Sequence, residues 1–216
     1  MRRILALALG MALTASSAAP AAAGEDWPRS ETCEKSWTVP LVRMAVVDAA
    51  MLAGLTAIWP EGFAPWRGAG SASQMKRTWT EGPVYLRGSP AFESDGDPAW
   101  LNAALHPIYG SEMHLAARGW GHDPVVAALF AGLSSAFWEY AIEGWFKRPS
   151  AVDLFWTPLA GAILGELRFR AWSAVARNVS SPFCRGLLMV LLDPLGELER
   201  LALGCAPPGQ KDIGGK

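Results

Sequence analysis

Prolines that directly follow a capping residue divide this chain into segments of helix length. Asp97-Pro98, Asp123-Pro124 and Asp193-Pro194 each place an acidic residue, which can cap a helix, before a proline, which suits the first helical turn. The stretches that follow these starts are largely apolar. The chain is therefore expected to fold mainly as helices whose starts are set by these prolines.

The predicted fold is all-α: a single bundle of about five to six helices, several of them short or kinked. Pro60 ends the first helix, and residues 61–97 are rich in Gly, Pro and Ser, which predicts a long irregular segment with at most a short strand around Pro83–Leu86. Irregular segments of this length are usually functional or packed by their own side chains. The predicted helices cover residues 38–59, 97–106, 123–147, 150–177 and 182–192. Pro107 can start or kink a further segment that ends at Gly119 and Gly121, and Asp193-Pro194 begins a further turn to Leu203.

Residues 1–23 have the three parts of a cleavable secretory signal. Arg2 and Arg3 precede the apolar stretch Ile4–Leu13, and Ala21–Ala23 offers a small-residue cleavage site. The apolar stretch is too short for a membrane anchor, which needs about 20 apolar residues. We therefore predict an exported protein, periplasmic or associated with the outer membrane. It would consist of one helical domain at 24–205, with the motifs at 95–170, and a flexible tail at 206–216.

The charge balance narrows the range of partners. Loss of Arg2 and Arg3 would leave 17 of the 19 basic residues against 20 acidic residues. This weakly acidic balance argues against nucleic acid and against a polybasic membrane patch. The 11 Trp residues favour a membrane surface or a lipid as partner, because Trp suits sites with one wet and one apolar end; a Trp-rich core is the alternative. The sequence points to no protein partner.

The uncharged runs within the predicted helices are short for a membrane span. The longest of them, Pro124–Trp138, has 15 residues, and a spanning helix needs about 18 or more. We therefore expect a soluble or membrane-resting bundle rather than a protein that crosses the membrane several times.

The three cysteines form no CxxC pair, which argues against zinc binding and thioredoxin-like chemistry. An oxidising compartment would permit one disulfide. Cys184 and Cys205 are the preferred pair because they bracket one helix-sized segment. The alternative is that all three thiols are free.

A row of polar and small residues precedes the central apolar segment. Histidine can act as an acid, a base or a ligand near neutral pH, so this row is a candidate site. The alternative is a hydrogen-bonded Asn–His pair that anchors a helix bend. If Pro107 does not break the helix, i, i+4 spacing places on one face Asn102, His106, Gly110, His114 and Arg118.

Glu139 and Glu143 lie one helical turn apart in an apolar segment. Two buried carboxylates repel each other unless a metal, a shared proton or a cation lies between them. Alternatively, Glu143 pairs with Lys147 on the surface and only Glu139 is buried. Glu166 has Arg170 four residues later, which favours a structural ion pair.

Ser150 and Asp153 match a capping box, which would explain Asp153 as a helix-cap partner alone. Thr157, Gly161 and Gly165 share one helical face, where their small side chains would let another helix approach closely.

Read together, these residues resemble a family of exported bacterial proteins, the domain of unknown function 3943. The series D-x-D-P-x-x-x-N-x-x-x-H-P-x-x-G, A-A-R, W-E-Y-x-x-E and P-S-x-x-D-L-x-x-T-P-x-x-G-x-x-x-G-E carries the resemblance from Asp95 to Arg170. The resemblance implies an envelope location and a set of shared residues, but no reaction. The matching positions include Asp95, Asp97, Asn102, His106, Arg118, Glu139, Glu143, Ser150, Asp153, Thr157, Gly161 and Glu166.

Three functions compete. The first is a structural or accessory role in the envelope. The second is an envelope hydrolase or transferase acting on a lipid or glycan, and the third is a binding module for an apolar ligand. No nucleophile elbow, Walker loop, HExxH or dinucleotide fingerprint is present, so neither a reaction nor a cofactor is indicated.

For the enzyme, His106 would be the acid or base, with carboxylates as bases or metal ligands. Asn102 and Arg118 would position an anionic group. Convergence of the catalytic candidates beside a cavity would favour the enzyme, and scattered helix caps would favour the structural role. The catalytic candidates are His106, Glu139, Glu143 and Asp153, and the binding candidates are Asn102, Arg118, Ser150 and Thr157.

Overall fold

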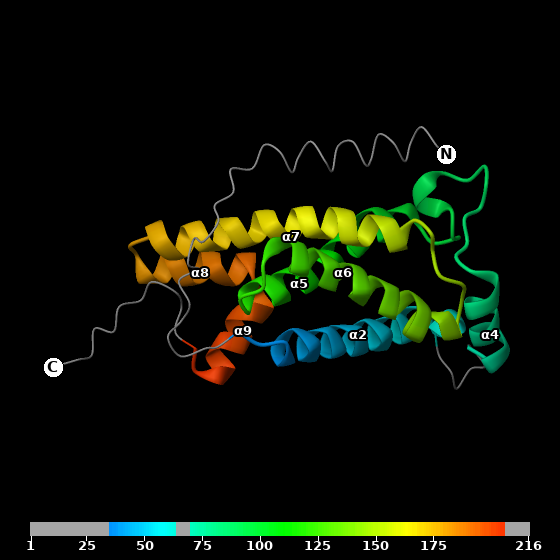
Figure 1. Cartoon of the computed structure of the whole chain (residues 1–216), viewed down its shortest axis with the longest axis horizontal. Helices are drawn as coiled ribbons and strands as arrows, with labels where there is room; N and C mark the ends of the chain where they lie inside the picture. The colour runs from blue at the N-terminus through cyan, green and yellow to red at the C-terminus, as the bar shows by residue number, and fades with distance from the viewer. Residues whose placement is uncertain (1–34, 64–69, 206–216) are drawn as a thin grey trace.

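The computed structural model describes residues 35–63 and 70–205, and these residues confirm the all-α prediction (Figure 1). They hold eight α-helices and no strand beyond an isolated parallel bridge between Val84 and Ser150. The predicted signal segment 1–23 and tail 206–216 lie outside the described residues. The helices are α2 (Thr38–Ile58), α3 (Pro60–Phe63), α4 (Ala72–Glu81), α5 (His106–Gly119), α6 (Pro124–Phe137), α7 (Asp153–Asn178), α8 (Pro182–Leu192) and α9 (Pro194–Leu203).

Helices α5, α6 and α7 pack against one another at the centre of the bundle. Figure 1 shows α7 and α2 on opposite sides of α5 and α6, with α8 folded back along α7. Glycines let α5 and α7 approach closely: a Cβ added to Gly110 would lie 2.3 Å from the Thr157 carbonyl oxygen, and one added to Gly165 would lie 2.7 Å from His114 Cβ. The small-residue face predicted on α7 is thus the contact surface for α5.

Two of the central helices contain π turns. The π turn η3 (Leu101–Leu105) leads directly into α5, and α6 continues through the π turn η4 (Trp138–Ile142) and the 3₁₀ turn η5 (Glu143–Trp145). Pro107 lies in the first turn of α5, and η3 precedes this turn without a break, so the helix predicted at 97–106 and the segment that Pro107 could start or kink form one continuous run. π turns often mark functional sites.

The segment predicted to be irregular at 61–97 is partly helical, so this prediction is wrong for α3 and α4. The Ser71 hydroxyl caps α4 by accepting a hydrogen bond from Gln74 N at 3.0 Å. Thr78 on α4 is buried and donates to the Gly144 carbonyl at 2.8 Å, which holds α4 against η5. The bridge at Val84 lies within the short strand expected at Pro83–Leu86.

The predicted disulfide between Cys184 and Cys205 is wrong. Cys205 is disulfide-bonded, whereas Cys184 in the first turn of α8 is an exposed free thiol. The segment between the two cysteines contains two helices, α8 and α9, joined at Asp193 rather than the single helix on which the prediction relied.

The bundle buries polar side chains and exposes apolar ones. Helices α6 and α7 each present to solvent an apolar row that repeats every four residues. A helix on the surface of a soluble protein has the opposite polarity. We call these two sets the α6 row (Val125, Leu129, Leu133 and Phe137) and the α7 row (Phe155, Leu159, Ile163 and Leu167).

By length and composition, two helices could cross a membrane: Thr38–Ile58 and Pro124–Trp145. Only 11% and 39% of their most apolar windows are buried inside the bundle. The uncharged runs within these helices are short, but the helices themselves reach the length and apolar composition of a span. The helix that begins at Pro124 continues past Glu139 and Glu143 through η4 and η5. Both of these carboxylates are buried in the bundle.

Candidate active site

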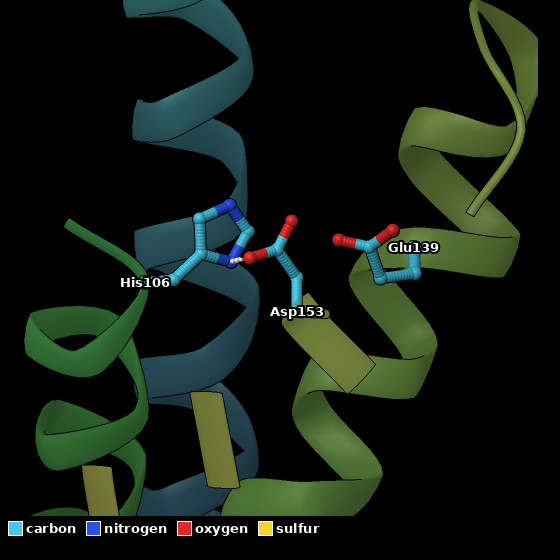
Figure 2. Close-up of side chains that lie close together, drawn as sticks. All are labelled: His106, Glu139 and Asp153. Carbon is cyan, nitrogen blue, oxygen red and sulfur yellow. Dashed lines mark ion pairs between the residues drawn. The ribbon is translucent and has the colours of Figure 1, made fainter. Parts of the chain in front are cut away.

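His106, Glu139 and Asp153 converge inside the bundle, and each comes from a different element (Figure 2). His106 begins α5, Glu139 lies in η4, and Asp153 begins α7. His106 Nδ1 lies 3.7 Å from Asp153 Oδ1, and the three residues offer ligand atoms that all lie within 4.8 Å of one another. All three side chains are buried. The structure thus brings three of the four predicted catalytic residues into one cluster, which we call the His–carboxylate cluster.

Hydrogen bonds from neighbouring residues orient this cluster. The Ser150 backbone N–H donates to Glu139 Oε2 at 2.7 Å, and Thr157 Oγ1 lies 3.0 Å from His106 Nδ1. Ser150 and Thr157, both predicted as binding residues, therefore contact Glu139 and His106 and hold them in place.

The capping box predicted at Ser150 and Asp153 is only half formed. Asp153 N donates to Ser150 Oγ at 3.2 Å, but the Ser150 N–H is taken by Glu139. The Asp153 carboxylate is consequently available to the cluster instead of closing the cap.

Glu143 lies in a second acidic group around Lys147. Lys147 Nζ forms an ion pair with Asp97, lies 3.3 Å from Glu143 Oε1 and lies 3.7 Å from Asp95 Oδ2. Asn102, another predicted binding residue, donates to Asp95 Oδ1 at 2.8 Å. The sequence left open whether Glu143 is buried with Glu139 or pairs with Lys147 on the surface. In the structure Glu143 pairs with Lys147 and is also buried.

The two groups together hold more negative than positive charge. Five carboxylates face one ammonium group, which leaves four negative charges if all are ionised and His106 is neutral. An unpaired buried charge is costly unless a cation or a proton compensates it. Carboxylate oxygens that are buried without a hydrogen-bond partner are Asp95 Oδ2, Glu139 Oε1, Glu143 Oε2 and both oxygens of Asp153.

The pKa values of the flanking groups reflect this crowding. Burial raises the pKa of Asp153 to about 7, and the nearby Asp95 carboxyl adds to the shift while Ser150 and Lys147 oppose it. Burial alone would raise the pKa of Asp95 and lower that of Lys147. The attraction of Lys147 for Asp95, and of Glu143 and Asp97 for Lys147, outweighs burial and shifts both pKa values the other way. Asp95 and Lys147 are therefore charged near neutral pH.

The cluster borders an apolar cavity of about 790 Å³ that lies between α2, α3, η3, α5 and η4. Its lining is mostly apolar and includes Met51, Trp59 and Leu101, while His106 and Glu143 place polar atoms in its wall. This volume is within the range of about 300–1,000 Å³ that is usual for small-molecule sites. Two of the four predicted catalytic residues, His106 and Glu143, thus line a cavity that can hold an apolar ligand.

Arg118, the remaining predicted binding residue, does not reach the site. It is three turns along α5 from His106, about 18 Å at 1.5 Å per residue. Its guanidinium donates to Glu166 Oε2 at 2.9 Å, and His114 and Arg170 contact the same carboxylate. This ion-pair group includes the Glu166–Arg170 pair expected from the sequence and is separate from the His–carboxylate cluster.

Charges at the α9 end of the bundle are also paired. Arg43 contacts Glu199 at 2.6 Å and Asp193 at 3.2 Å, and Arg168 contacts Glu112 at 2.7 Å. Each of these carboxylates has an arginine, whereas no described lysine or arginine lies within 4.0 Å of Glu139 or Asp153. Among the described residues Asp48 is also buried without a lysine or arginine, but it is a single carboxylate that accepts from Tyr109, whereas the cluster brings two such carboxylates together.

Two residues of the site, Lys147 and Asp95, are not among the predicted catalytic residues, although the sequence could have indicated them. Lys147 follows Glu143 by one turn, and Asp95 stands two residues before Asp97 in the family series. Neither spacing shows that the two segments meet, because the contact depends on the loop before η3 folding onto η5.

Fold and site define an all-helical protein with a buried histidine–carboxylate cluster beside an apolar cavity. Residues 91–195 match the model of the family described as Domain of unknown function (DUF3943), and this region of the chain belongs to that family. The match contains every residue of the cluster and leaves out α2 and α4. No curated protein and no solved structure matches the chain.

Proposed function

We propose that this protein is a membrane-embedded enzyme of the cell envelope, a hydrolase or transferase that acts on a lipid. The observation that carries the proposal is the His–carboxylate cluster, which reaches an apolar cavity through His106, inside a bundle whose outer surface is apolar.

A purely structural role does not account for the cluster. A buried carboxylate stabilises a fold when it is paired, as Glu166 is with Arg118, and destabilises it when it is not. Glu139 and Asp153 keep unpartnered oxygens within the described residues. Ionisable groups kept at such a cost inside an apolar bundle are typical of functional sites.

The outer surface supports the membrane part of the proposal. Helix α2 has 21 residues, about 31 Å of helix, which matches a hydrocarbon core of about 30 Å. Its two charged residues are buried: Asp48 accepts from the Tyr109 hydroxyl at 2.9 Å, and Arg43 pairs with Glu199. Lipid is the surrounding that suits such a helix, because hydrocarbon does not penalise exposed apolar side chains.

The envelope location rests on two features. Residues 1–23 have the pattern of a secretory signal. Cys205 is disulfide-bonded, and structural disulfides persist in oxidising compartments such as the periplasm.

The charge of the site suggests which bond of the lipid reacts. The excess of carboxylates disfavours a lipid whose reacting group is anionic. Arg118, which was expected to bind an anionic group, pairs with Glu166 outside the site. A neutral acyl ester or amide suits the site better. The acyl chain would occupy the cavity, His106 and Asp153 would orient a water or an acceptor hydroxyl, and Glu143 would accept its proton. The oxygen would bond to the acyl carbonyl carbon, the ester C–O or amide C–N bond would break, and Glu143 would pass the proton it accepted to the leaving oxygen or nitrogen.

A lipid turnover screen tests this proposal. The full chain, purified in detergent, is incubated with acyl phospholipids and acylated glycolipids, and products are identified by mass spectrometry. We expect released fatty acid or a transferred acyl chain, and a loss of at least about 100-fold in rate for Glu143→Gln. An absence of turnover on every acyl lipid, or an unchanged rate in a folded Glu143→Gln variant, would count against the proposal.

A further inference from the structure

We infer that His106, Glu139 and Asp153 bind a divalent first-row metal ion, of the Zn²⁺ or Mn²⁺ class. The inference deepens the proposed function and rests on it for the reaction that the ion would assist. Metal binding itself can be measured without any turnover.

The geometry leaves room for one ion. Ligand atoms about 2.1 Å from a tetrahedral ion lie about 3.4 Å apart. His106 Nδ1 and Asp153 Oδ1 are 3.7 Å apart, and all three residues offer atoms within 4.8 Å of one another. Figure 2 shows the Asp153 carboxylate between the imidazole and the Glu139 carboxylate. Small side-chain movements would bring the three groups to coordination distance.

Unpartnered oxygens are an independent sign that a cation binds here. Glu139 and Asp153 are both 0% exposed, and Glu139 Oε1 and both Asp153 oxygens have no hydrogen-bond partner. Lys147 does not fill this role, because its ammonium contacts Asp95, Asp97 and Glu143. A divalent ion at the cluster would halve the excess of four negative charges.

The surrounding contacts are those of a metal site. Ligands are normally held by an outer shell of hydrogen bonds, and here the Ser150 N–H donates to Glu139 Oε2. Thr157 Oγ1 lies 3.0 Å from His106 Nδ1, the ring nitrogen that also faces Asp153, so an ion bound at Nδ1 would replace this hydrogen bond. One imidazole and two carboxylates suit Zn²⁺, Mn²⁺ or Fe²⁺. Three protein ligands leave a coordination position for water, which is the arrangement of a catalytic rather than a structural site.

Metal content and affinity test the inference on the full chain in detergent. We expect about one ion per chain by elemental analysis, removal of this ion by a chelator, and a rise in melting temperature when ZnCl₂ or MnCl₂ is restored. Glu139→Gln and Asp153→Asn should bind the added ion at least about 100-fold more weakly. Glu166→Gln is the matched control, because Glu166 also lies on α7 beside a histidine but is paired with arginines.

A second measurement needs no variant. Co²⁺ added to the chelator-treated wild-type protein should give visible absorption bands of a nitrogen- and oxygen-coordinated ion. No stoichiometric metal and no Co²⁺ bands would overturn the inference, as would equal loss of binding in Glu166→Gln. A bound ion without lipid turnover would reject the proposed function and keep the metal site, whereas lipid turnover by a protein that binds no added ion would reject the metal site and keep the proposed function.

Discussion

The backbone N–H of Ser150 donates to Glu139 and not to Asp153. Because of this hydrogen bond, Ser150 and Asp153 do not form a complete capping box, and the Asp153 carboxylate faces His106 and Glu139 instead. The sequence spacing of Ser150 and Asp153 predicted the cap. It could not predict the competing acceptor, because Glu139 reaches Ser150 from another helix. Residue types and spacing therefore selected three side chains that lie together in the structure, and left open whether Asp153 serves the cap or the cluster.

The Ser150 hydroxyl and its N–H have separable roles. Ser150→Ala removes the hydroxyl that accepts from Asp153 N but keeps the N–H that holds Glu139. We expect a loss of about 1 kcal/mol in the free energy of unfolding, as for other helix caps. Metal affinity should stay within a few-fold of wild type. Denaturant unfolding and metal titration check the two parts, and a loss of metal binding as large as that of Glu139→Gln would show that the hydroxyl is itself a ligand.

Asp153 should destabilise the metal-free protein. Its carboxylate is buried beside other carboxylates, so Asp153→Asn removes repulsion and keeps the shape of the side chain. We expect the variant to melt at a temperature equal to or above that of wild type in the presence of a chelator, and below it in excess metal. A variant that is strongly destabilised in the chelator would instead indicate a structural role for Asp153.

At the scale of elements, the contact between α5 and α7 positions the cluster. His106 and Asp153 begin these two helices, and the glycines along the contact hold the helix axes close together. The i, i+4 pattern predicted the face of α5 that carries Gly110 and His114 and the face of α7 that carries Gly161 and Gly165, and these faces are in contact. The π turns η3 and η4 were not predictable, because an extra residue in a turn leaves no compositional mark.

Adding a methyl group at this contact should destabilise the fold. A Cβ on Gly161 would lie 2.6 Å from the Gly110 backbone, which cannot move aside as a side chain can. We expect Gly161→Ala to cost about 1–3 kcal/mol. Gly186→Ala on α8 is the control, since nothing lies within 4 Å of its Cβ, and it should be neutral or stabilising by up to about 1 kcal/mol. Equal effects of the two changes in thermal unfolding would argue against close packing of α5 on α7.

For the molecule as a whole, the arrangement of polarity is the main feature that the sequence did not reveal. The fold class was predictable from helix starts and apolar segments. Uncharged runs understate the apolar outer surface, because charges such as Asp48 and Glu139 are buried and interrupt a run in the sequence without reaching that surface. Which face a charge occupies becomes clear only when the helices are packed.

Replacing one residue of the α6 row by lysine distinguishes lipid from water as the medium around the bundle. Leu133 is 70% exposed, and in water Leu133→Lys should change stability by at most about 0.5 kcal/mol. At the centre of a bilayer it should cost about 2.5–3.5 kcal/mol. We expect the larger effect in lipid vesicles, with less protein in the membrane fraction, and little effect from Tyr85→Lys in the loop before the site. Equal tolerance of both changes would mean that the α6 row does not face lipid.

The central claim is that the buried His–carboxylate cluster acts on a lipid. It is tested most directly by the rate of acyl release or transfer in micelles for wild type, Glu139→Gln and Glu166→Gln. We expect a measurable wild-type rate, a loss of at least about 100-fold in Glu139→Gln with its fold retained, and a rate close to wild type in Glu166→Gln. Equal rates for wild type and a folded Glu139→Gln variant would contradict the claim.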